Sequence, residues 1–237
     1  MDRRQFLTLG AAASVLGASS LVAEPAWAWP KGCLERLPIV GHARMAWTLD
    51  DGFSLPAMKA YVKLLQKNPE LKMTFFVLQE APAWKTLAKP ITELVTAGQV
   101  QLANHTWTHK SLTSLSDKHI KEQLTHCGKF IEDTFGVSAG TYFRPPYGNI
   151  DSRVVRVARQ VGYTTPVLWL GSTGAGAGET RAGNWKMCQK WMTNGRIVID
   201  HSNNNATVQN FDRILGLIKS RDLQTVTLTE VFGAGLH

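Results

Sequence analysis

The chain contains the segment Arg44-Met-Ala-Trp-Thr-Leu-Asp-Asp-Gly52, a short apolar run that ends in two adjacent carboxylates and a glycine. A second run, Met73-Thr-Phe-Phe-Val-Leu78, is rich in β-branched and aromatic residues and has the pattern of a buried strand. A third, Val100 to Ala103, leads directly into Asn104-His-Thr-Trp-Thr-His-Lys110. Polar residues with reactive side chains therefore follow expected strands.

Helical and strand patterns alternate along the rest of the chain. Helices are expected over 55–65, from Pro90 through Val95, from Ser116 to Gly136, over 151–161, near 184–191 and over 208–218. Further strands are expected over 141–143, 164–170, 196–199 and 225–228, with a Gly-rich loop over 171–183. Repeated βα units imply a parallel sheet, open or closed into a barrel, and barrel enzymes place their active sites at the C-terminal ends of the strands.

The first twenty-eight residues have the features of an export signal. Arg3 and Arg4 form a twin arginine, a mildly apolar run follows to about Ala23, and Ala26-Trp-Ala28 fits a small-x-small cleavage pattern. The apolar run is short and weak for a membrane span, and an uncleaved anchor is the alternative. We expect a twin-arginine signal peptide over 1–28, a catalytic domain over 29–237, and a periplasmic or secreted product without stable membrane insertion.

The chain is basic, with a net charge of +8. The expected signal carries two basic residues (Arg3, Arg4) and two acidic ones (Asp2, Glu24), so its removal leaves the charge at +8. A basic exported protein favours anionic partners such as cell-wall polymers, and a generically basic surface is the alternative. No Lys/Arg-rich run of the nucleic-acid type occurs, so no nucleic-acid partner is expected.

The cysteine count is odd. Cys33, Cys127 and Cys188 form no Cys-x-x-Cys pair, and one disulfide plus a free thiol is compatible with an oxidising compartment. The sequence does not select the pair. A Cys/His metal cluster around His126-Cys127 is a weaker alternative, because no second ligand pair stands nearby.

The histidines His105 and His109 and the carboxylates Asp50 and Asp51 are of the types that hold a divalent metal and leave a position open for water. If the histidine segment coils, both rings lie one helical turn apart and can face one ion. The two aspartates would point to opposite faces of a strand, but a bend at the strand's end can bring both to its mouth. Asp-Asp-Gly alone is also common turn chemistry. Together, the four residues predict a metal hydrolase.

Four motifs occur in the order and spacing of the polysaccharide deacetylases, which form carbohydrate esterase family four. They are Thr48-Leu-Asp-Asp-Gly52, His105-Thr-Trp-Thr-His109, Arg144-Pro-Pro-Tyr-Gly148 and Ile199-Asp-His201. The chain resembles this family from roughly Ala46 to Ser202, as an exported bacterial member. The resemblance implies a distorted (β/α) barrel of about seven parallel strands with the active site at their C-terminal ends.

The resemblance also assigns the metal site. It makes Asp50 the general base and Asp51, His105 and His109 the metal ligands. A base must keep a lone pair off the metal while touching its water, so two carboxylates in two roles are physically reasonable. Zn²⁺ is the expected occupant, with Co²⁺ or another divalent ion as the alternative.

The later motifs supply the remaining implied roles. Arg144 would hold the base aspartate, the backbone N–H of Tyr147 would help to bind the oxyanion, and His201 would protonate the leaving amine. A rigid turn with a solvated arginine is the alternative for Arg144. Ile199 stands where the family has a leucine that lines the acetyl pocket.

One motif departs from the family's pattern. An aspartate that orients the acid histidine usually follows a tryptophan between the third and last motifs, but here the stretch reads Trp169-Leu-Gly-Ser-Thr-Gly-Ala-Gly-Ala-Gly178. Ser172 or Thr173 stands near the expected aspartate. Asp200 is the neighbouring carboxylate, but strand alternation points it away from His201, and Glu179 in the loop is the other candidate. We expect His201 to be less well held than in the family.

The motifs together predict a metal-dependent hydrolase that removes acetyl groups from N-acetylated sugars of a chitin-like or peptidoglycan chain. An O-acetyl esterase acting on a polysaccharide such as xylan is one alternative, because an alkoxide leaves more easily than an amine and depends less on a well-held acid. A weakly active glycan-binding relative is the other. The sequence leaves open the glycan, the preference for N- or O-acetyl groups, and the oligomeric state.

Overall fold

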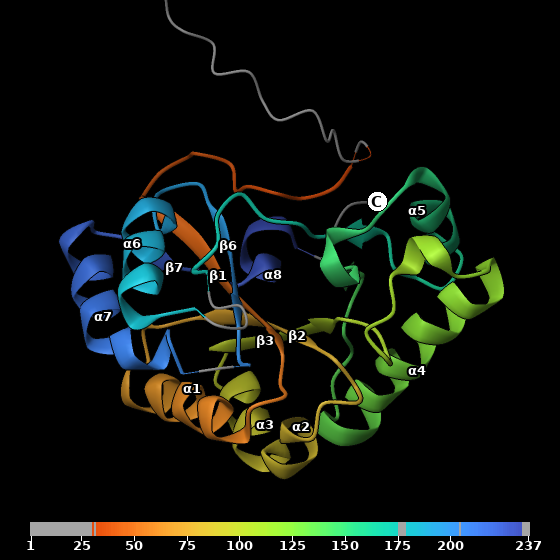
Figure 1. Ribbon diagram of the computed structural model, residues 1–237, viewed down its shortest axis with the longest axis horizontal. Helices are drawn as coiled ribbons and strands as arrows, with labels where there is room; N and C mark the ends of the chain where they lie inside the picture. The colour runs from red at the N-terminus through yellow and green to blue at the C-terminus, as the bar shows by residue number, and fades with distance from the viewer. Residues whose placement is uncertain (1–29, 31, 175–178, 204, 234–237) are drawn as a thin grey trace, which may run out of the picture.

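Strands and helices alternate along the chain in a computed structural model that describes residues 30, 32–174, 179–203 and 205–233 (Figure 1). The expected signal peptide over 1–28 lies outside the described residues. The elements, with short 3₁₀ helices marked η, follow in this order: β1 (Arg44–Asp51), α1 (Leu55–Lys67), β2 (Met73–Val77), α2 (Ala83–Thr86), α3 (Ala88–Thr96), β3 (Val100–Asn104), η1 (Leu112–Ser114), α4 (Asp117–Phe135), β4 (Tyr142–Phe143), η2 (Pro146–Gly148), α5 (Ser152–Arg159), β5 (Thr165–Pro166), α6 (Arg181–Trp191), β6 (Ile197–His201), η3 (Val208–Asn210), α7 (Phe211–Ser220), β7 (Gln224–Thr225) and α8 (Leu228–Phe232).

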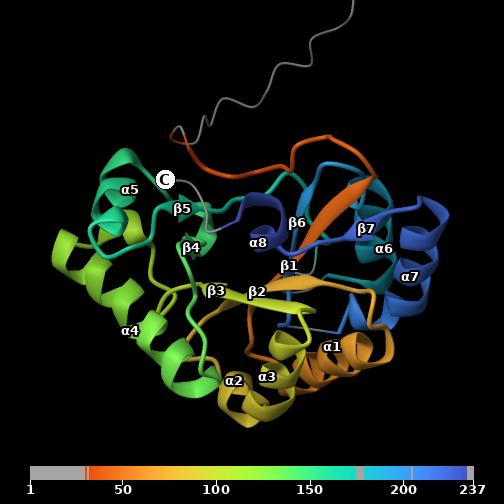
Figure 2. The ribbon, with the colours of Figure 1, turned by 180° about the vertical axis from the view of Figure 1, so that it is seen from behind.

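The described strands form one parallel sheet that curls into a distorted barrel. Their order is β5-β4-β3-β2-β1-β6, and β7 pairs with the start of β1. The chain that follows β5 closes the circle along β6: Leu170 donates its N–H to the carbonyl of Ile197, and Ile199 donates to Gly171, both at 3.0 Å. Helices α7, α1, α3, α2, α4 and α5 form an outer arc around the strands (Figures 1 and 2). The expected barrel of parallel strands is confirmed.

The strand register brings the polar motifs to one edge of this sheet. One row of paired Cα positions crosses four strands at Asp51, Val77, Asn104 and Phe143. On the other side of β1, Asp50 pairs with His201 of β6. Because parallel strands end at the same edge, the residues at and just after these positions are neighbours in space.

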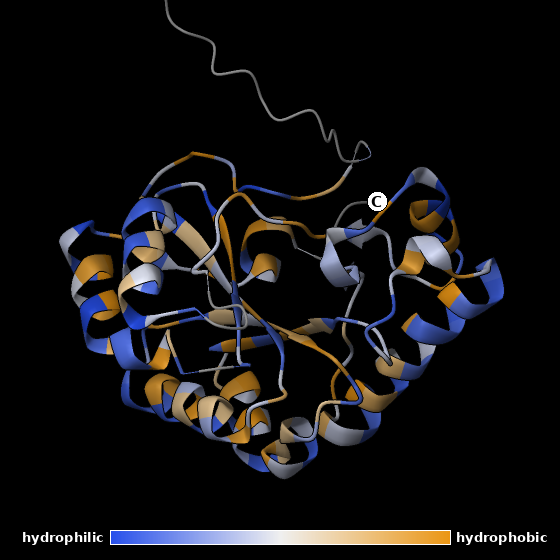
Figure 3. Cartoon of the chain, in the orientation of Figure 1, coloured by the Kyte–Doolittle hydropathy of each residue, from blue (hydrophilic) through white to orange (hydrophobic). Residues whose placement is uncertain are grey.

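Apolar side chains pack in two layers, one between the sheet and the helices and one inside the barrel. The inner layer contains Ala46, Phe76, Ala103, Ile197 and Leu228. Helices α1, α4 and α7 carry both hydrophobic and hydrophilic residues, as expected for helices that cover a sheet and face solvent (Figure 3). Each large apolar side chain that is fully buried contributes roughly 1.5–3 kcal/mol, so the two layers hold the strand ends in place.

The end of the chain differs from the sequence prediction. A strand was expected over 225–228, but β7 covers only Gln224–Thr225, and Leu228 begins α8. Thr227 and Glu230 form a reciprocal capping box, in which each side chain accepts a hydrogen bond from the backbone N–H of the other residue. This cap starts a helix at the point where the apolar pattern alone suggested a continuing strand.

Two other boundaries also move. The helix expected from Pro90 begins earlier, at Ala88, because a proline within the first turn removes only an N–H that has no partner inside the helix. The strand expected over 164–170 is regular only at Thr165–Pro166. Beyond β5 the chain leaves β4 and pairs with β6, so its alternating apolar residues continue without a regular ladder.

All three cysteines are free thiols, so the disulfide considered above is absent. Burial raises the pKa of Cys127 to about 12, and burial together with the charge of Glu35 raises that of Cys33 to about 11. His126 stacks on Trp107, with ring centroids 4.3 Å apart and 9° between the planes. The described residues offer no ligand set around His126-Cys127, so the Cys/His cluster is not supported.

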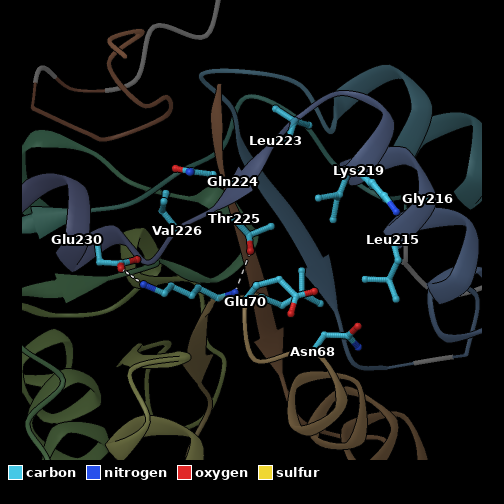
Figure 4. Close-up of a pocket in the computed structure, with 13 residues that line it drawn as sticks. Asn68, Glu70, Leu215, Gly216, Lys219, Leu223, Gln224, Thr225, Val226 and Glu230 are labelled. Carbon is cyan, nitrogen blue, oxygen red and sulfur yellow. Dashed lines mark hydrogen bonds and ion pairs between the residues drawn. The ribbon is translucent and has the colours of Figure 1, made fainter. Parts of the chain in front are cut away.

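A cavity of about 700 Å³ lies between the end of α1, α7 and β7, at the N-terminal ends of the strands (Figure 4). Leu71, Leu215 and Leu223 contribute its apolar part, and Lys72 pairs with Glu230 at its side. None of the site residues predicted from the sequence lines this cavity. Within the described ranges, no helix has the length and apolarity that crossing a membrane requires.

Candidate active site

The two aspartates at the end of β1 reach the same side of the barrel because the backbone turns sharply there. Asp51 has a left-handed φ of 75°, and Gly52 follows with φ 106°. A Cβ at Gly52 would lie 2.6 Å from Nε1 of Trp84, which donates a hydrogen bond to the Asp51 carbonyl at 2.6 Å. Only glycine fits under this indole, so Gly52 is required by the turn that brings both aspartates to the site.

Asp51, His105 and His109 converge on one point. Oδ1 of Asp51 lies 3.4 Å from Nε2 of His105 and 3.4 Å from Nε2 of His109. One candidate ligand atom from each residue lies within 4.8 Å of the other two. Oδ1 of Asp51 is buried and has no hydrogen-bond partner among the described residues. An orphaned carboxylate oxygen facing two imidazole nitrogens fits a bound divalent cation.

The segment that carries the two histidines is a bent loop, and not the helical turn that was considered as one way to bring the two rings together. Thr106 and His109 have φ values of 80° and 54°, which a right-handed helix does not contain. The side chain of Asn104 accepts the Thr106 N–H at 2.8 Å, and that of Gln123 accepts the Thr108 N–H at 2.9 Å. Polar side chains therefore replace the helical hydrogen bonds, and the two rings meet because the loop folds back.

A hydrogen bond fixes the orientation of the first histidine. Nδ1 of His105 lies 2.8 Å from the carbonyl oxygen of Arg144, which can only accept. The proton of the neutral ring therefore sits on Nδ1, and Nε2 presents its lone pair to the centre of the site. The second ring, His109, has Nδ1 3.2 Å from the hydroxyl of Tyr147.

Arg144 is fully buried inside the barrel and grips the first aspartate. Its Nη1 donates to Oδ1 of Asp50 at 2.6 Å and to the hydroxyl of Thr48 at 2.8 Å. Nε and Nη2 donate to the carbonyls of Val167 and Leu168 at 3.3 and 3.2 Å. The alternative of a solvated arginine in a rigid turn is excluded, because the guanidinium has no exposed surface. The other carboxylate oxygen, Oδ2 of Asp50, lies 3.6 Å from Nε2 of His105.

The charges in the site set the protonation of the ligands. Burial alone would raise the pKa of Asp51, but the charge of a protonated His105 and the hydrogen bond from Asn203 hold that pKa well below its usual value. Burial opposes protonation of His105, yet the charges of Asp50 and Asp51 raise its pKa. Burial and the charge of His105 lower the pKa of His109. An anionic Asp51 with a neutral His109 is the protonation pattern that metal ligation needs.

The family model for polysaccharide deacetylase matches residues 40–166 of this chain, which carry the first three motifs. The chain belongs to the polysaccharide deacetylase family. Chitin deacetylase 1 of Cryptococcus neoformans is 38% identical to it over 148 residues, which are 60% of this chain and 29% of that protein. The peptidoglycan-N-acetylglucosamine deacetylase PgdA of Listeria monocytogenes is 28% identical over 199 residues, which are 83% of this chain and 40% of that protein. The chain thus spans less than half the length of these curated relatives.

Solved structures share the fold of this family member. BA3943 of Bacillus anthracis, described as a pseudoenzyme of carbohydrate esterase family four, has a TM-score of 0.73 at 20% identity. The match covers 84% of this chain and 68% of that one. At this identity the likeness establishes the curled parallel barrel, while the chemistry depends on the residues of this chain.

The remaining predicted residues of this deacetylase-family site lie around the same mouth. His201 faces Asp50 across the β1–β6 pair, and the buried Ile199 lies two residues before it. Tyr147 is 67% exposed and has a φ of 61°. Nδ1 of His201 is buried and has no hydrogen-bond partner among the described residues. Ser172, Thr173 and Glu179 therefore do not take the place of the family's aspartate at that atom.

Asn203 is a site residue that the sequence analysis missed. Its Nδ2 donates to Oδ2 of Asp51 at 2.6 Å, which leaves Oδ1 of the same carboxylate free for an ion. The two residues are 152 positions apart, and no local pattern singles out Asn203. Its position two residues after His201 was the one available signal.

Replacing Asn203 with alanine should weaken metal binding by about 10- to 100-fold, because the carboxylate of Asp51 loses the donor that orients it. Isothermal titration calorimetry with Zn²⁺ measures this change. Asn205→Ala is the matched control, since Asn205 is exposed and its side chain makes no hydrogen bond to Asp51, His105 or His109 within the described part of the chain. Equal affinities for the Asn203→Ala and Asn205→Ala variants would show that the hydrogen bond does not orient the ligand.

Metal binding should release a proton near neutral pH. The neighbouring carboxylates raise the pKa of His105 above 6.5, and Nε2 must lose its proton to ligate. A raised pKa stabilises the metal-free fold below pH 6.5, and this contribution is lost as the pH rises through the folded-state pKa. We therefore expect Zn²⁺ affinity to increase as the pH rises above 6.5, and the binding enthalpy to vary with the ionisation enthalpy of the buffer. A flat affinity and a buffer-independent enthalpy would contradict this expectation.

Proposed function

We propose that this protein is a metal-dependent hydrolase that removes acetyl groups from N-acetylated sugars of a chitin-like or peptidoglycan chain. The observation that carries the proposal is one group of residues: buried Asp51 and His105 and half-buried His109, which form a candidate ligand set, with Asp50 directly beside it. Membership in the polysaccharide deacetylase family supports the same activity. Chitin and peptidoglycan deacetylases among the relatives support an N-acetylglucosamine polymer as the substrate class.

We propose Zn²⁺ as the resident ion, with Co²⁺ as a substitute. Two imidazole nitrogens and one carboxylate oxygen form a ligand set typical of catalytic zinc, and three protein ligands leave room for water and substrate. Such an ion would polarise the acetyl carbonyl and lower the pKa of the attacking water. Asp51, His105 and His109 would hold it through the atoms described above.

Asp50 is proposed as the general base. Arg144 ties down its Oδ1 at 2.6 Å, while Oδ2 lies 3.6 Å from Nε2 of His105, on the side of the ligand set. Oδ2 can therefore take a proton from a water at the centre of the site without being a ligand itself. The water oxygen forms a bond to the acetyl carbon, and the carbonyl electrons move onto the acetyl oxygen.

Tyr147 and His201 complete the proposed reaction. The backbone N–H of Tyr147 would donate to the developing oxyanion. His201 would give a proton to the sugar nitrogen as the carbon–nitrogen bond breaks. Acetate and a free amino sugar are the products, and the proton taken by Asp50 balances the one given by His201.

Acetate release tests this proposal. Purified protein should release acetate from chitin oligosaccharides or from peptidoglycan, lose that activity on chelation, and regain it with Zn²⁺ or Co²⁺. The amino groups produced can be counted by a fluorescent amine reagent on the same samples. Glycan binding without acetate release across both substrate classes would instead favour a weakly active binding relative.

An O-acetyl esterase is a second candidate, and the unpartnered Nδ1 of His201 favours it. An alkoxide is a better leaving group than an amine, so an ester needs less help from a well-held acid. Comparing kcat/KM on acetylated xylan and on chitin oligosaccharides separates the two. A rate on xylan that exceeds the rate on chitin by more than tenfold would make the ester the substrate.

We also propose that the protein is exported through the twin-arginine signal over 1–28, a proposal that rests on the sequence alone. Changing both Arg3 and Arg4 to lysine should retain the protein in the cytoplasm of the producing cell. Fractionation with an antibody to the catalytic domain would detect the change. Undiminished export of the lysine variant would exclude the twin-arginine route.

A further inference from the structure

Asp200 stands immediately before His201 on β6 and is a completely buried carboxylate. Its Oδ2 accepts hydrogen bonds from Nε1 of Trp47 at 3.0 Å and from the hydroxyl of Tyr61 at 2.6 Å. Its Oδ1 accepts from the hydroxyl of Thr173 at 2.7 Å and from that of Thr207 at 2.9 Å. All these partners are donors, as an ionised carboxylate requires because it can only accept.

Oδ1 of Asp200 also accepts the backbone N–H of His201 itself, at 2.9 Å. On the other side of the histidine, Ser202 donates its N–H to the Asp50 carbonyl at 3.3 Å and its hydroxyl to the same oxygen at 3.2 Å. The main chain of His201 is therefore held on both sides, while Nδ1 of its ring has no partner among the described residues. The direction of the ring is therefore set through the backbone of His201.

The Asp200 carboxylate also links the segments that meet where the chain after β5 pairs with β6 and closes the barrel. Thr173 belongs to the chain that follows β5, and Thr207 lies just before η3. Asn184 of α6 donates to the Thr173 carbonyl at 3.0 Å and to the Thr207 hydroxyl at 2.8 Å. Charge and burial raise the pKa of Tyr61 well above its usual value, so its hydroxyl stays a donor to Asp200.

We propose that Asp200 is the positioning residue of His201, an inference that rests on the proposed function. Neighbouring strand residues point to opposite faces, so Asp200 is anchored in the layer behind β6 while His201 faces the site. The hydrogen bond between the Asp200 side chain and the His201 N–H fixes the direction in which the His201 side chain leaves the end of β6. Thr173 is one of the two residues near the position where the family's orienting aspartate is expected, and here its hydroxyl donates to Asp200. The orienting carboxylate thus lies behind the strand and acts through the backbone.

The test compares two substrates that differ in whether a general acid must protonate the leaving group. A chitin oligosaccharide needs protonation of its leaving amine, whereas 4-nitrophenyl acetate releases a phenolate that needs none. Asp200→Asn should lower kcat/KM on the amide by about 10- to 100-fold and change the ester rate by less than about threefold. His201→Ala should show the same selectivity. Adding Asp200→Asn to His201→Ala should lower the amide rate by no more than about twofold further, because the two residues act through one group.

Equal losses on both substrates would show that Asp200 only supports the fold, and would overturn the inference while leaving the proposed function intact. A wild-type protein that hydrolyses the ester but no acetylated amide would refute the proposed function and the inference with it. If Asp200→Asn does not fold, Thr173→Val removes one hydrogen bond to the same carboxylate and should shift the amide-to-ester ratio in the same direction. Ser172→Ala is its matched control, because the Ser172 hydroxyl accepts from Gly174 and does not contact Asp200. An unchanged ratio in Thr173→Val would contradict the inference.

Discussion

Replacing Asp50 with asparagine should lower kcat/KM for acetate release by about 10²- to 10⁴-fold, the range that a general base contributes. The amide oxygen of asparagine can still accept the hydrogen bond that Nη1 of Arg144 donates at 2.6 Å, so the fold is retained. An amide cannot take a proton from water at neutral pH. Steady-state acetate release from a chitin oligosaccharide, with the metal bound, measures the loss.

The matched control is Asp51→Asn, one residue further along β1. That variant should lose metal affinity, because Oδ1 of Asp51 faces both imidazoles at 3.4 Å. Asp50→Asn should bind Zn²⁺ within about threefold of wild type, since we propose Asp50 as the base and not as a ligand. Undiminished activity of the Asp50 variant would refute its role as base, and a shared loss of metal would show that both aspartates are ligands.

Much of this site could be predicted from the sequence because its reactive residues stand at the ends of strands or directly after them. β1 and β3 have apolar patterns that predict buried strands, and the register places Asp51 and Asn104 in the same row. The residues that follow such strands must meet at one edge of a parallel sheet. The residues proposed as metal ligands and as base could therefore be selected from the pattern and the resemblance, even though the two histidines lie on a bent loop and not on a helical turn.

The contacts that orient the site were not predictable in the same way. Asn203 meets Asp51 across 152 residues, and Trp47 meets Asp200 across 153. Such pairs follow from how the strands and loops pack, and neither the periodicity nor the spacing of residues in the sequence predicts them. The regular strand β5 is also shorter than its apolar pattern predicts, because the chain leaves β4 to close the barrel against β6. Tertiary pairing there overrides the local preference.

Removing the guanidinium of Arg144 should have the largest effect on stability of any single substitution in the site. The side chain is fully buried, makes four hydrogen bonds to Asp50, Thr48 and two carbonyls, and lies over the Phe76 ring with Cζ 4.0 Å from its centroid. Arg144→Met keeps much of the volume but leaves Asp50 as a buried carboxylate without its cation. We expect a loss of about 3–5 kcal/mol in the free energy of unfolding.

For a chain of this size, that loss corresponds to a decrease in Tm of about 10 °C. The measurement should be made in chelator, because bound metal would stabilise the fold by mass action and hide part of the difference. The double variant Asp50→Asn with Arg144→Met removes both charges. It should be more stable than Arg144→Met alone by more than about 1 kcal/mol, because most of the cost in the single variant is the uncompensated carboxylate. If the losses of stability caused by Asp50→Asn and by Arg144→Met simply add in the double variant, Arg144 stabilises the fold by packing alone. Its ion pair with Asp50 then makes no separate contribution.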